Sequence, residues 1–227
     1  IIVTTGASEA LIFTLNVICD AGDEVIIPEP FYANYNGFAS SAGVNVVPVI
    51  SEFTSQFELP SLENITVKIT TKTKAILLCN PSNPTGYVYN EKEISTLCEL
   101  AIKYDIFLIV DEVYREFIYS GNKHYSVLQY SGGIEHTVMI DSVSKRYSLC
   151  GARVGCIVST SERFIQNILK FAHLRLSPPS IALIASEAAL DAPDSYLKEV
   201  VAEYEVRRSV LIEYLEKIPN VKVSHPI

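Results

Sequence analysis

The chain has 227 residues, 48% of them hydrophobic and 19% charged, which is typical of one large globular domain, or one and a half smaller ones, and excludes a disordered protein. The formal net charge of −8, without any run of Lys or Arg, argues against a nucleic-acid-binding surface. The longest apolar runs are only strand-sized and no signal peptide opens the sequence, so we expect a cytoplasmic protein without a membrane span.

Seven strands are expected from short apolar runs, at residues 1–5, 24–28, 44–50, 74–80, 106–114, 137–140 and 154–158. Helices are expected at residues 6–19, through 38–43, inside 51–71, and at 90–104, 161–172, 180–190 and 195–217. The last residues, 220–227, resemble the start of another strand. Alternating strands and helices predict the α/β class, with three α/β/α layers around a mostly parallel seven-stranded sheet.

The cysteines and histidines predict neither a metal site nor disulfides. The five cysteines are an odd number and show no Cys-x-x-Cys spacing, so reduced, buried thiols of a cytosolic protein are the default interpretation. The four histidines are scattered, and we interpret them as structural or surface residues. These residues are Cys19, Cys79, Cys98, Cys150, Cys156, His124, His136, His173 and His225.

Polar clusters follow the predicted strands at the point where each strand ends. Ligands of parallel sheets bind beyond the carboxyl ends of the strands, so this placement predicts a binding site at that edge. The first cluster also opens a helix, where free backbone N–H groups attract anions. The clusters are Gly6-Ala7-Ser8, Asn83, Asp111 with Tyr114, and Ser142 with Ser144 and Lys145.

Lys145 stands in a polar turn between two predicted strands. Its amine is suited to form a Schiff base with an aldehyde, while Ser142, Ser144 and Arg153 hold an anionic group beside it. The alternative is a solvated loop lysine, which a lone Ser-x-Ser-Lys favours. The clusters at the other strand ends favour the site.

Six motifs together resemble the class I/II aminotransferases, enzymes that depend on pyridoxal 5′-phosphate (PLP) and have fold type I. The motifs occur in the family's order and approximate spacing, and they cover essentially the whole chain. They are TGASEA at 5–10, PEPFY at 28–32, NPSNPTG at 80–86, DEVY at 111–114, SVSK at 142–145 and GARVG at 151–155.

The resemblance implies catalytic roles for three residues. Lys145 resembles the lysine that forms the Schiff base with PLP and later moves the substrate proton. Asp111 resembles the carboxylate that keeps the pyridine nitrogen protonated, and otherwise it would be a helix cap or an ion-pair partner. Tyr114 resembles the residue that donates to the cofactor's phenolate oxygen.

The resemblance also implies the other contacts of the cofactor. Asn83 resembles the second donor to the phenolate oxygen, and otherwise it would be a turn residue. Tyr32 stands where the family stacks an aromatic ring on the pyridine, although Phe31 or a packing role is an alternative. The phosphate would be held by the start of the first helix and by side chains of the lysine turn, namely Gly6, Ala7, Ser8, Ser142, Ser144 and Arg153.

The family's domain organisation implies that residues 1–217 are a PLP-binding large domain, including the interdomain helix at 195–217, and that 218–227 begin a truncated small C-terminal domain. The substrate-carboxylate arginine and an N-terminal segment of the family are not found in this sequence. We therefore expect the chain to bind PLP but to transaminate weakly or not at all. A homodimer is expected by resemblance only.

The implied activity is transfer of an amino group between an L-amino acid, aspartate-like or aromatic or neutral, and a 2-oxo acid. Two alternatives stay open. One is another fold type I enzyme, such as a C–S β-lyase or an aminocyclopropane carboxylate synthase, which would release different products. The other is a non-catalytic domain of a transcription regulator, which the absence of a basic segment disfavours.

Overall fold

Seven strands form one sheet in the order β1-β7-β6-β5-β4-β2-β3 in a computed structural model that describes residues 1–119, 121–132 and 134–226. The pairs β2–β3, β2–β4, β4–β5 and β5–β6 are parallel, while β7 runs antiparallel to β6 and β1. The mostly parallel seven-stranded sheet is thus confirmed. The strands are β1 (Ile2–Thr4), β2 (Glu24–Glu29), β3 (Asn45–Ile50), β4 (Thr73–Cys79), β5 (Phe107–Asp111), β6 (Thr137–Ser142) and β7 (Gly155–Val158).

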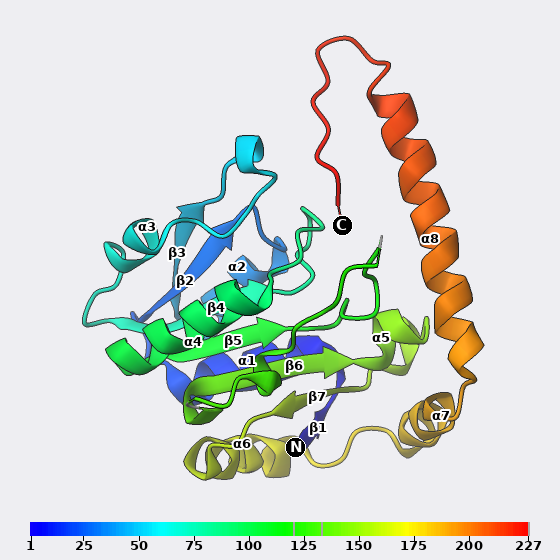
Figure 1. Cartoon of the computed structure of the whole chain (residues 1–227). Helices are drawn as coiled ribbons and strands as arrows, with labels where there is room; N and C mark the ends of the chain where they lie inside the picture. Colours follow the sequence, from blue (N-terminus) through cyan, green and yellow to red (C-terminus); the bar gives the residue numbers. More distant parts are fainter. Residues whose placement is uncertain (120, 133, 227) are drawn as a thin grey trace.

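Helices cover both faces of the sheet, which gives the three expected layers (Figure 1). Side chains of α1 (Gly6–Ile18), α2 (Asn34–Ser41) and α6 (Glu162–Arg175) pack on one face, and those of α3 (Leu62–Thr66) and α4 (Glu91–Tyr104) on the other. Because both faces are covered, the central strands β4 and β5 are apolar along nearly their whole length. The remaining helices are α5 (Val143–Arg146), α7 (Ser180–Leu190) and α8 (Asp194–Leu215).

The long C-terminal helix is found nearly where expected, but its apolar stripe is not buried. α8 lies to one side of the sheet (Figure 1), and Tyr204 and Leu211 are 46% and 59% exposed. The predicted pair of Glu203 with Arg207 is present, with a separation of 2.7 Å between Oε1 and Nε. None of the helices in the described parts of the chain combines the length and apolar character needed to cross a bilayer.

Two expectations about strands are wrong. The strand expected at 106–114 ends at Asp111, because turn hydrogen bonds from Arg115 N to Glu112 O and from Phe117 N to Tyr114 O bend the chain away. Residues 221–226 form no strand, since their backbone groups bind side chains: His225 N donates to Gln56 and Pro226 O accepts from Arg208. Residue 227 lies outside the described residues.

Three neighbouring strands end side by side at one edge of the sheet. β4 ends at Cys79, β5 at Asp111 and β6 at Ser142, and Cys79 is paired with Asp111 in register. The loop that follows β4 is clamped by the buried Asn80, whose amide binds backbone groups of Tyr89 and Tyr125. The side chains beyond these ends are therefore held on a rigid frame.

Candidate active site

The lysine turn is a single helical turn placed at the end of β6. The Ser142 hydroxyl accepts a hydrogen bond from Ser144 N at 3.4 Å and so caps α5. Lys145 follows within the same turn, with Nζ 5.6 Å from the centroid of the Tyr114 ring. The amine therefore lies between the ends of β5 and β6.

The Asp111 carboxylate is the buried negative group of the site, and its residue is only 5% exposed. Burial in the protein raises its pKa to about 6, because the charged form loses solvation. Two hydrogen bonds oppose this increase: Tyr35 Oη donates to Oδ2 at 2.9 Å, and Val113 N donates to Oδ1 at 3.3 Å. The charge of Asp111 therefore depends on its burial and on the groups that hydrogen-bond to it.

Tyr114 lies next to both the Asp111 carboxylate and the Lys145 amine. Burial raises the pKa of its hydroxyl, and the neighbouring Lys145 amine acts in the opposite direction. A cation close to a phenol favours the phenolate. Burial is the larger of the two effects, so the Tyr114 hydroxyl stays protonated and can donate a hydrogen bond to a ligand in the site.

The opposite end of the site is built for an anion. α1 begins at Gly6, whose φ of +75° suits glycine, and a Cβ there would overlap the Arg153 guanidinium. Arg153 Nη1 donates to Cys150 O at 3.0 Å, which leaves further N–H groups for a ligand. Gly155 allows α1 to pack closely on β7, since a Cβ there would lie 2.8 Å from Ala7 N.

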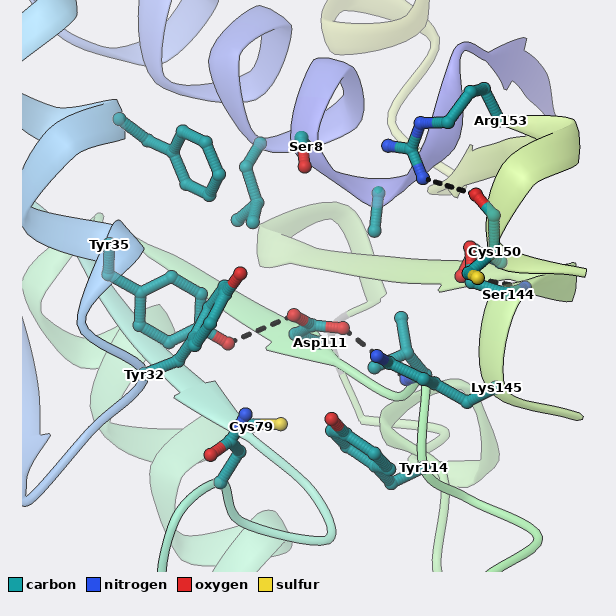
Figure 2. A pocket seen from close by; sticks show the side chains of 16 residues that line it. Ser8, Tyr32, Tyr35, Cys79, Asp111, Tyr114, Ser144, Lys145, Cys150 and Arg153 are labelled. Atoms are coloured by element: carbon teal, nitrogen blue, oxygen red, sulfur yellow. Dashed lines mark hydrogen bonds between the residues drawn. The ribbon is translucent and has the colours of Figure 1, made fainter. Parts of the chain in front are cut away.

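These groups surround one cavity of about 260 Å³ (Figure 2). Ten of the eleven residues expected at the site line it, and Gly6 lies behind it against Arg153. Figure 2 shows Ser8 and Arg153 at one end of the cavity, and Asp111 further in, with Tyr35 on one side of it and Lys145 and Tyr114 on the other. The ten are Ala7, Ser8, Tyr32, Asn83, Asp111, Tyr114, Ser142, Ser144, Lys145 and Arg153.

This donor set fits PLP. A carboxylate at one end suits a protonated ring nitrogen, the flanking aromatic rings of Tyr32 and Phe38 suit a flat ring, and the hydroxyls and guanidinium at the other end suit a phosphate. Lys145 lines the same cavity, beside Asp111 and Tyr114. Arg153 can take its place in the anion cradle only because Gly6 lacks a Cβ.

Six further lining residues were missed from the sequence: Leu11, Tyr35, Phe38, Cys79, Val113 and Cys150. Tyr35 follows Tyr32 by three residues, in the turn that leads into α2 and in which Tyr35 N donates to Tyr32 O, and that spacing is the signal that could have placed the two rings together. The expectation of buried thiols is confirmed for Cys79 and Cys98, while Cys19 and Cys156 are half-buried. It is wrong for Cys150, which is exposed because it lies in a short 3-10 turn that lines the cavity. All five cysteines are free thiols.

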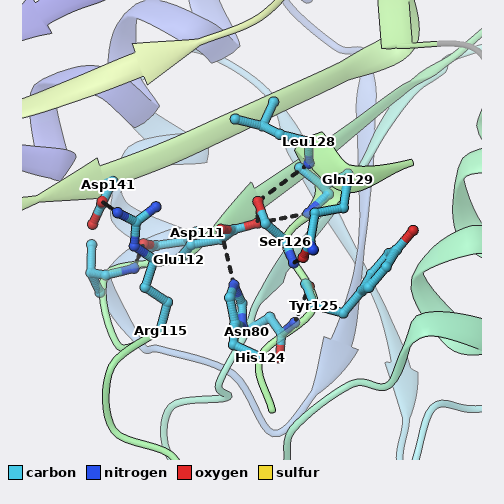
Figure 3. A network of polar contacts seen from close by, with 12 residues as sticks. Asn80, Asp111, Glu112, Arg115, His124, Tyr125, Ser126, Leu128, Gln129 and Asp141 are labelled. Atoms are coloured by element: carbon cyan, nitrogen blue, oxygen red, sulfur yellow. Dashed lines mark hydrogen bonds and ion pairs between the residues drawn. The ribbon is translucent and has the colours of Figure 1, made fainter. Parts of the chain in front are cut away.

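A second polar network lies behind Asp111 (Figure 3). Glu112 is fully buried, and its Oε1 accepts hydrogen bonds from Ser126 Oγ and Val127 N, both at 2.9 Å. Its Oε2 lies 3.0 Å from His124 Nε2. This network fastens the segment around 124–127 to the end of β5, next to the Asp111 backbone. Within the part of the chain that the structure describes, no group of three His, Cys, Asp or Glu side chains could hold a metal ion.

Comparison with known proteins agrees with this geometry. The family model described as "Aminotransferase class I and II" matches residues 1–226. Aspartate aminotransferase of Bacillus subtilis is 39% identical over 228 residues, which cover 100% of this chain and 58% of that protein. The chain therefore spans little more than half the length of that relative.

Two solved structures have nearly the same fold. Aspartate aminotransferase from Thermotoga maritima superposes with a TM-score of 0.90 at 32% identity, covering 99% of this chain and 59% of the other. Aromatic aminotransferase from Pyrococcus horikoshii gives a TM-score of 0.89 at 29% identity, covering 98% and 61%.

Proposed function

The chain belongs to the class I and II aminotransferases, and we propose that its cavity binds PLP and serves transfer of an amino group between an L-amino acid and a 2-oxo acid. PLP is the cofactor on which the family depends. The observation that carries the proposal is the cavity itself, which is lined by one lysine amine, a buried carboxylate and an anion cradle.

When bound, PLP supplies an aldehyde, with which a lysine amine condenses with loss of water, and a pyridine ring that withdraws electrons from the substrate. Asp111 would hold a proton at the ring nitrogen. A cation there would stabilise the charged carboxylate and lower the pKa that burial has raised. Lys145 would be the attached amine and would afterwards move the substrate proton.

The remaining residues would bind and orient the cofactor. Tyr114 and Asn83 would donate to its phenolate oxygen, and the Tyr32 ring would cover one face of the pyridine. The phosphate would accept hydrogen bonds at the cradle, from the backbone at the start of α1 and from Ser8, Ser142, Ser144 and Arg153.

The names of relatives support a substrate class. Aspartate aminotransferases and an aromatic aminotransferase are among them, so we propose an acidic, aromatic or neutral L-amino acid with a 2-oxo acid acceptor. An assay with these amino donors and 2-oxoglutarate separates the proposal from a lyase. Amino transfer requires the oxo acid, whereas a lyase releases pyruvate and ammonia without it.

The cofactor is tested by adding PLP, reducing with borohydride and mapping the modified peptide. We expect phosphopyridoxyl on Lys145 and its loss in Lys145→Ala. Lys170→Ala in α6, far along the chain from the cavity-lining residues, is the matched control and should keep the label. Labelling of Lys170 or Lys74 in place of Lys145 would contradict the proposal.

We also propose that residues 1–217 form the cofactor-binding unit and that the protein is a homodimer. Supporting the dimer, large apolar side chains at the end of α6 and on α7 are exposed, among them Leu174 at 83% and Ile181 at 85%. Sedimentation equilibrium should report twice the chain mass. A monomer at every concentration measured would refute the dimer.

A further inference from the structure

Four charged side chains form a cluster directly behind the wall of the cavity. Two are cationic, Arg115 and Arg146, and two are anionic, Glu116 and Asp141. None of them lines the cavity, yet each is at most two positions from a residue that does. Arg115 and Glu116 follow Tyr114, Asp141 precedes Ser142, and Arg146 follows Lys145.

Arg146 is at the centre of this charged cluster. Its Nη2 donates to Asp141 Oδ2 at 2.8 Å, and its Nε lies 3.2 Å from Glu116 Oε1. Arg115 contacts the same two carboxylates at longer range, 3.5 and 3.6 Å (its contact with Asp141 belongs to the network in Figure 3). The guanidinium of Arg146 thus joins α5 both to β6 and to the segment that carries Tyr114.

Burial makes each charge in this cluster depend on its partner. The side chains of Arg146 and Asp141 are only 12% and 9% exposed. Burial raises the pKa of Asp141, and the two arginines oppose that increase. The second oxygen of Asp141, Oδ1, accepts from Ser142 N at 2.8 Å. Partly buried charges of this kind stay ionised only while each has its partner, so removing one leaves the other uncompensated.

The short helix needs such an anchor. α5 has four residues, too few for a helix to be stable by its own hydrogen bonds. Its position is fixed by the Ser142 cap, by Val143 N donating to Val154 O at 3.2 Å, and by Arg146. Of these three contacts, only that of Arg146 also holds the segment that carries Tyr114.

We propose that Arg146 is a positioning residue, which through Asp141 and Glu116 sets where the Lys145 amine lies relative to Tyr114 and Asp111. It does not line the cavity. Its function is to hold α5 so that Lys145 meets the aldehyde carbon of the cofactor. This inference rests on the proposed function.

The test compares PLP with pyridoxine 5′-phosphate, which has the same ring and phosphate but no aldehyde. Lys145 can form a Schiff base only with PLP. In Arg146→Met we expect the affinity for PLP, and the rate of borohydride-trapped labelling at Lys145, to fall by roughly tenfold or more. The affinity for pyridoxine 5′-phosphate should fall much less, by about twofold, because Ser144 is its only proposed contact on α5, whereas Ser8, Arg153 and the start of α1 lie on other elements.

Matched variants sharpen the comparison. Arg163→Met, which removes an exposed arginine of α6, should change neither affinity. Asp141→Asn should reproduce the selective loss, and the Asp141→Asn/Arg146→Met double variant should lose little more than either single variant. Arg146→Lys should recover only part of the labelling rate, since one ammonium cannot match the two-sided contact of the guanidinium.

Equal losses for the two ligands, or none for either, would overturn the inference and show a merely structural cluster. Failure of the wild-type protein to label at Lys145 would instead refute the proposed function. If Arg146→Met does not fold, Glu116→Gln carries the same comparison, because Glu116 is 34% exposed and its loss leaves the contact with Asp141 intact.

Discussion

Tyr35 donates a hydrogen bond of 2.9 Å to the Asp111 carboxylate across 76 positions of sequence. The tyrosine is 1% exposed, and its ring meets that of Tyr32 edge-on at a centroid distance of 5.5 Å. The aromatic wall of the cavity and its buried carboxylate are therefore one connected unit. A change at Tyr35 must alter the charge balance of Asp111 without touching the carboxylate itself.

Tyr35→Phe should raise the pKa of Asp111 above its value of about 6, because the lost hydrogen bond favours the charged carboxylate. The measurement is a carbon-13 NMR titration of the aspartate carboxyl groups in cofactor-free protein, with Asp111→Asn to assign the signal. Tyr32→Phe is the matched control, since the Tyr32 hydroxyl accepts from Asn34. An unchanged or lower pKa in Tyr35→Phe would show that the hydrogen bond does not control the charge.

The raised pKa of Asp111 also makes stability depend on pH. An aspartate has an ordinary pKa of 3.8, and Asp111 in the folded chain has about 6, so between these values the folded state binds more protons than the unfolded state. The contribution of Asp111 to the free energy of unfolding therefore falls as the pH rises from the unfolded to the folded pKa. Above the folded pKa the full loss of stability is reached. Asp111 destabilises the cofactor-free protein at neutral pH.

Asp111→Asn, which cannot ionise, should therefore be the more stable protein above about pH 6 in the absence of cofactor. The difference should be of the order of 2–3 kcal/mol and should shrink as the pH is lowered towards 4. Urea unfolding of both proteins at several pH values tests this. A difference that does not vary with pH would mean that ionisation of Asp111 is not its source.

The layers and strand ends could be predicted from the sequence because they depend on local patterns. Continuous apolar runs such as those of β4 and β5 are typical of strands covered on both faces, and polar residues at their ends meet because parallel strands share a carboxyl edge. The exact end of β5 could not be predicted, since Val113 is apolar but lies in a turn closed by local backbone hydrogen bonds, which the apolar pattern does not reveal.

Contacts that join distant segments were not visible in the sequence. Tyr35 reads as an ordinary core tyrosine until β5 is placed beside α2, and Arg146 reads as a surface residue of a polar turn until Glu116 is brought to it by the turn after β5. Both are side-chain contacts, and neither has a characteristic spacing.

Arg153→Met should weaken PLP binding by roughly 10- to 100-fold, because charge-assisted hydrogen bonds of about 1.5–3 kcal/mol to the phosphate are lost. Binding of pyridoxal, which has no phosphate, should stay within about twofold, as it lacks the group that the guanidinium contacts. Both affinities are measured by absorbance titration, with Arg163→Met as a control. Equal losses for the two ligands would place Arg153 outside the phosphate cradle.

Gly6 and Gly22 form a matched pair that isolates the role of the cradle. Both have positive φ, +75° and +91°, so alanine at either position is strained by about 1–2 kcal/mol. Nothing lies within 4 Å of a Cβ on Gly22, whereas a Cβ on Gly6 would overlap the Arg153 guanidinium. Gly6→Ala must therefore displace Arg153 in addition to bearing the backbone strain.

We expect Gly22→Ala to lower the free energy of unfolding without changing the affinity for PLP. Gly6→Ala should lower the free energy of unfolding by more than Gly22→Ala does, and should also lower the affinity for PLP. Urea unfolding and PLP titration are the measurements. Adding Arg153→Ala removes the obstructing guanidinium, so Gly6→Ala should then cost only about as much as Gly22→Ala, that is, about the strain of 1–2 kcal/mol. If Gly6→Ala costs the same with and without Arg153, the overlap with the guanidinium is not what requires glycine at the start of α1.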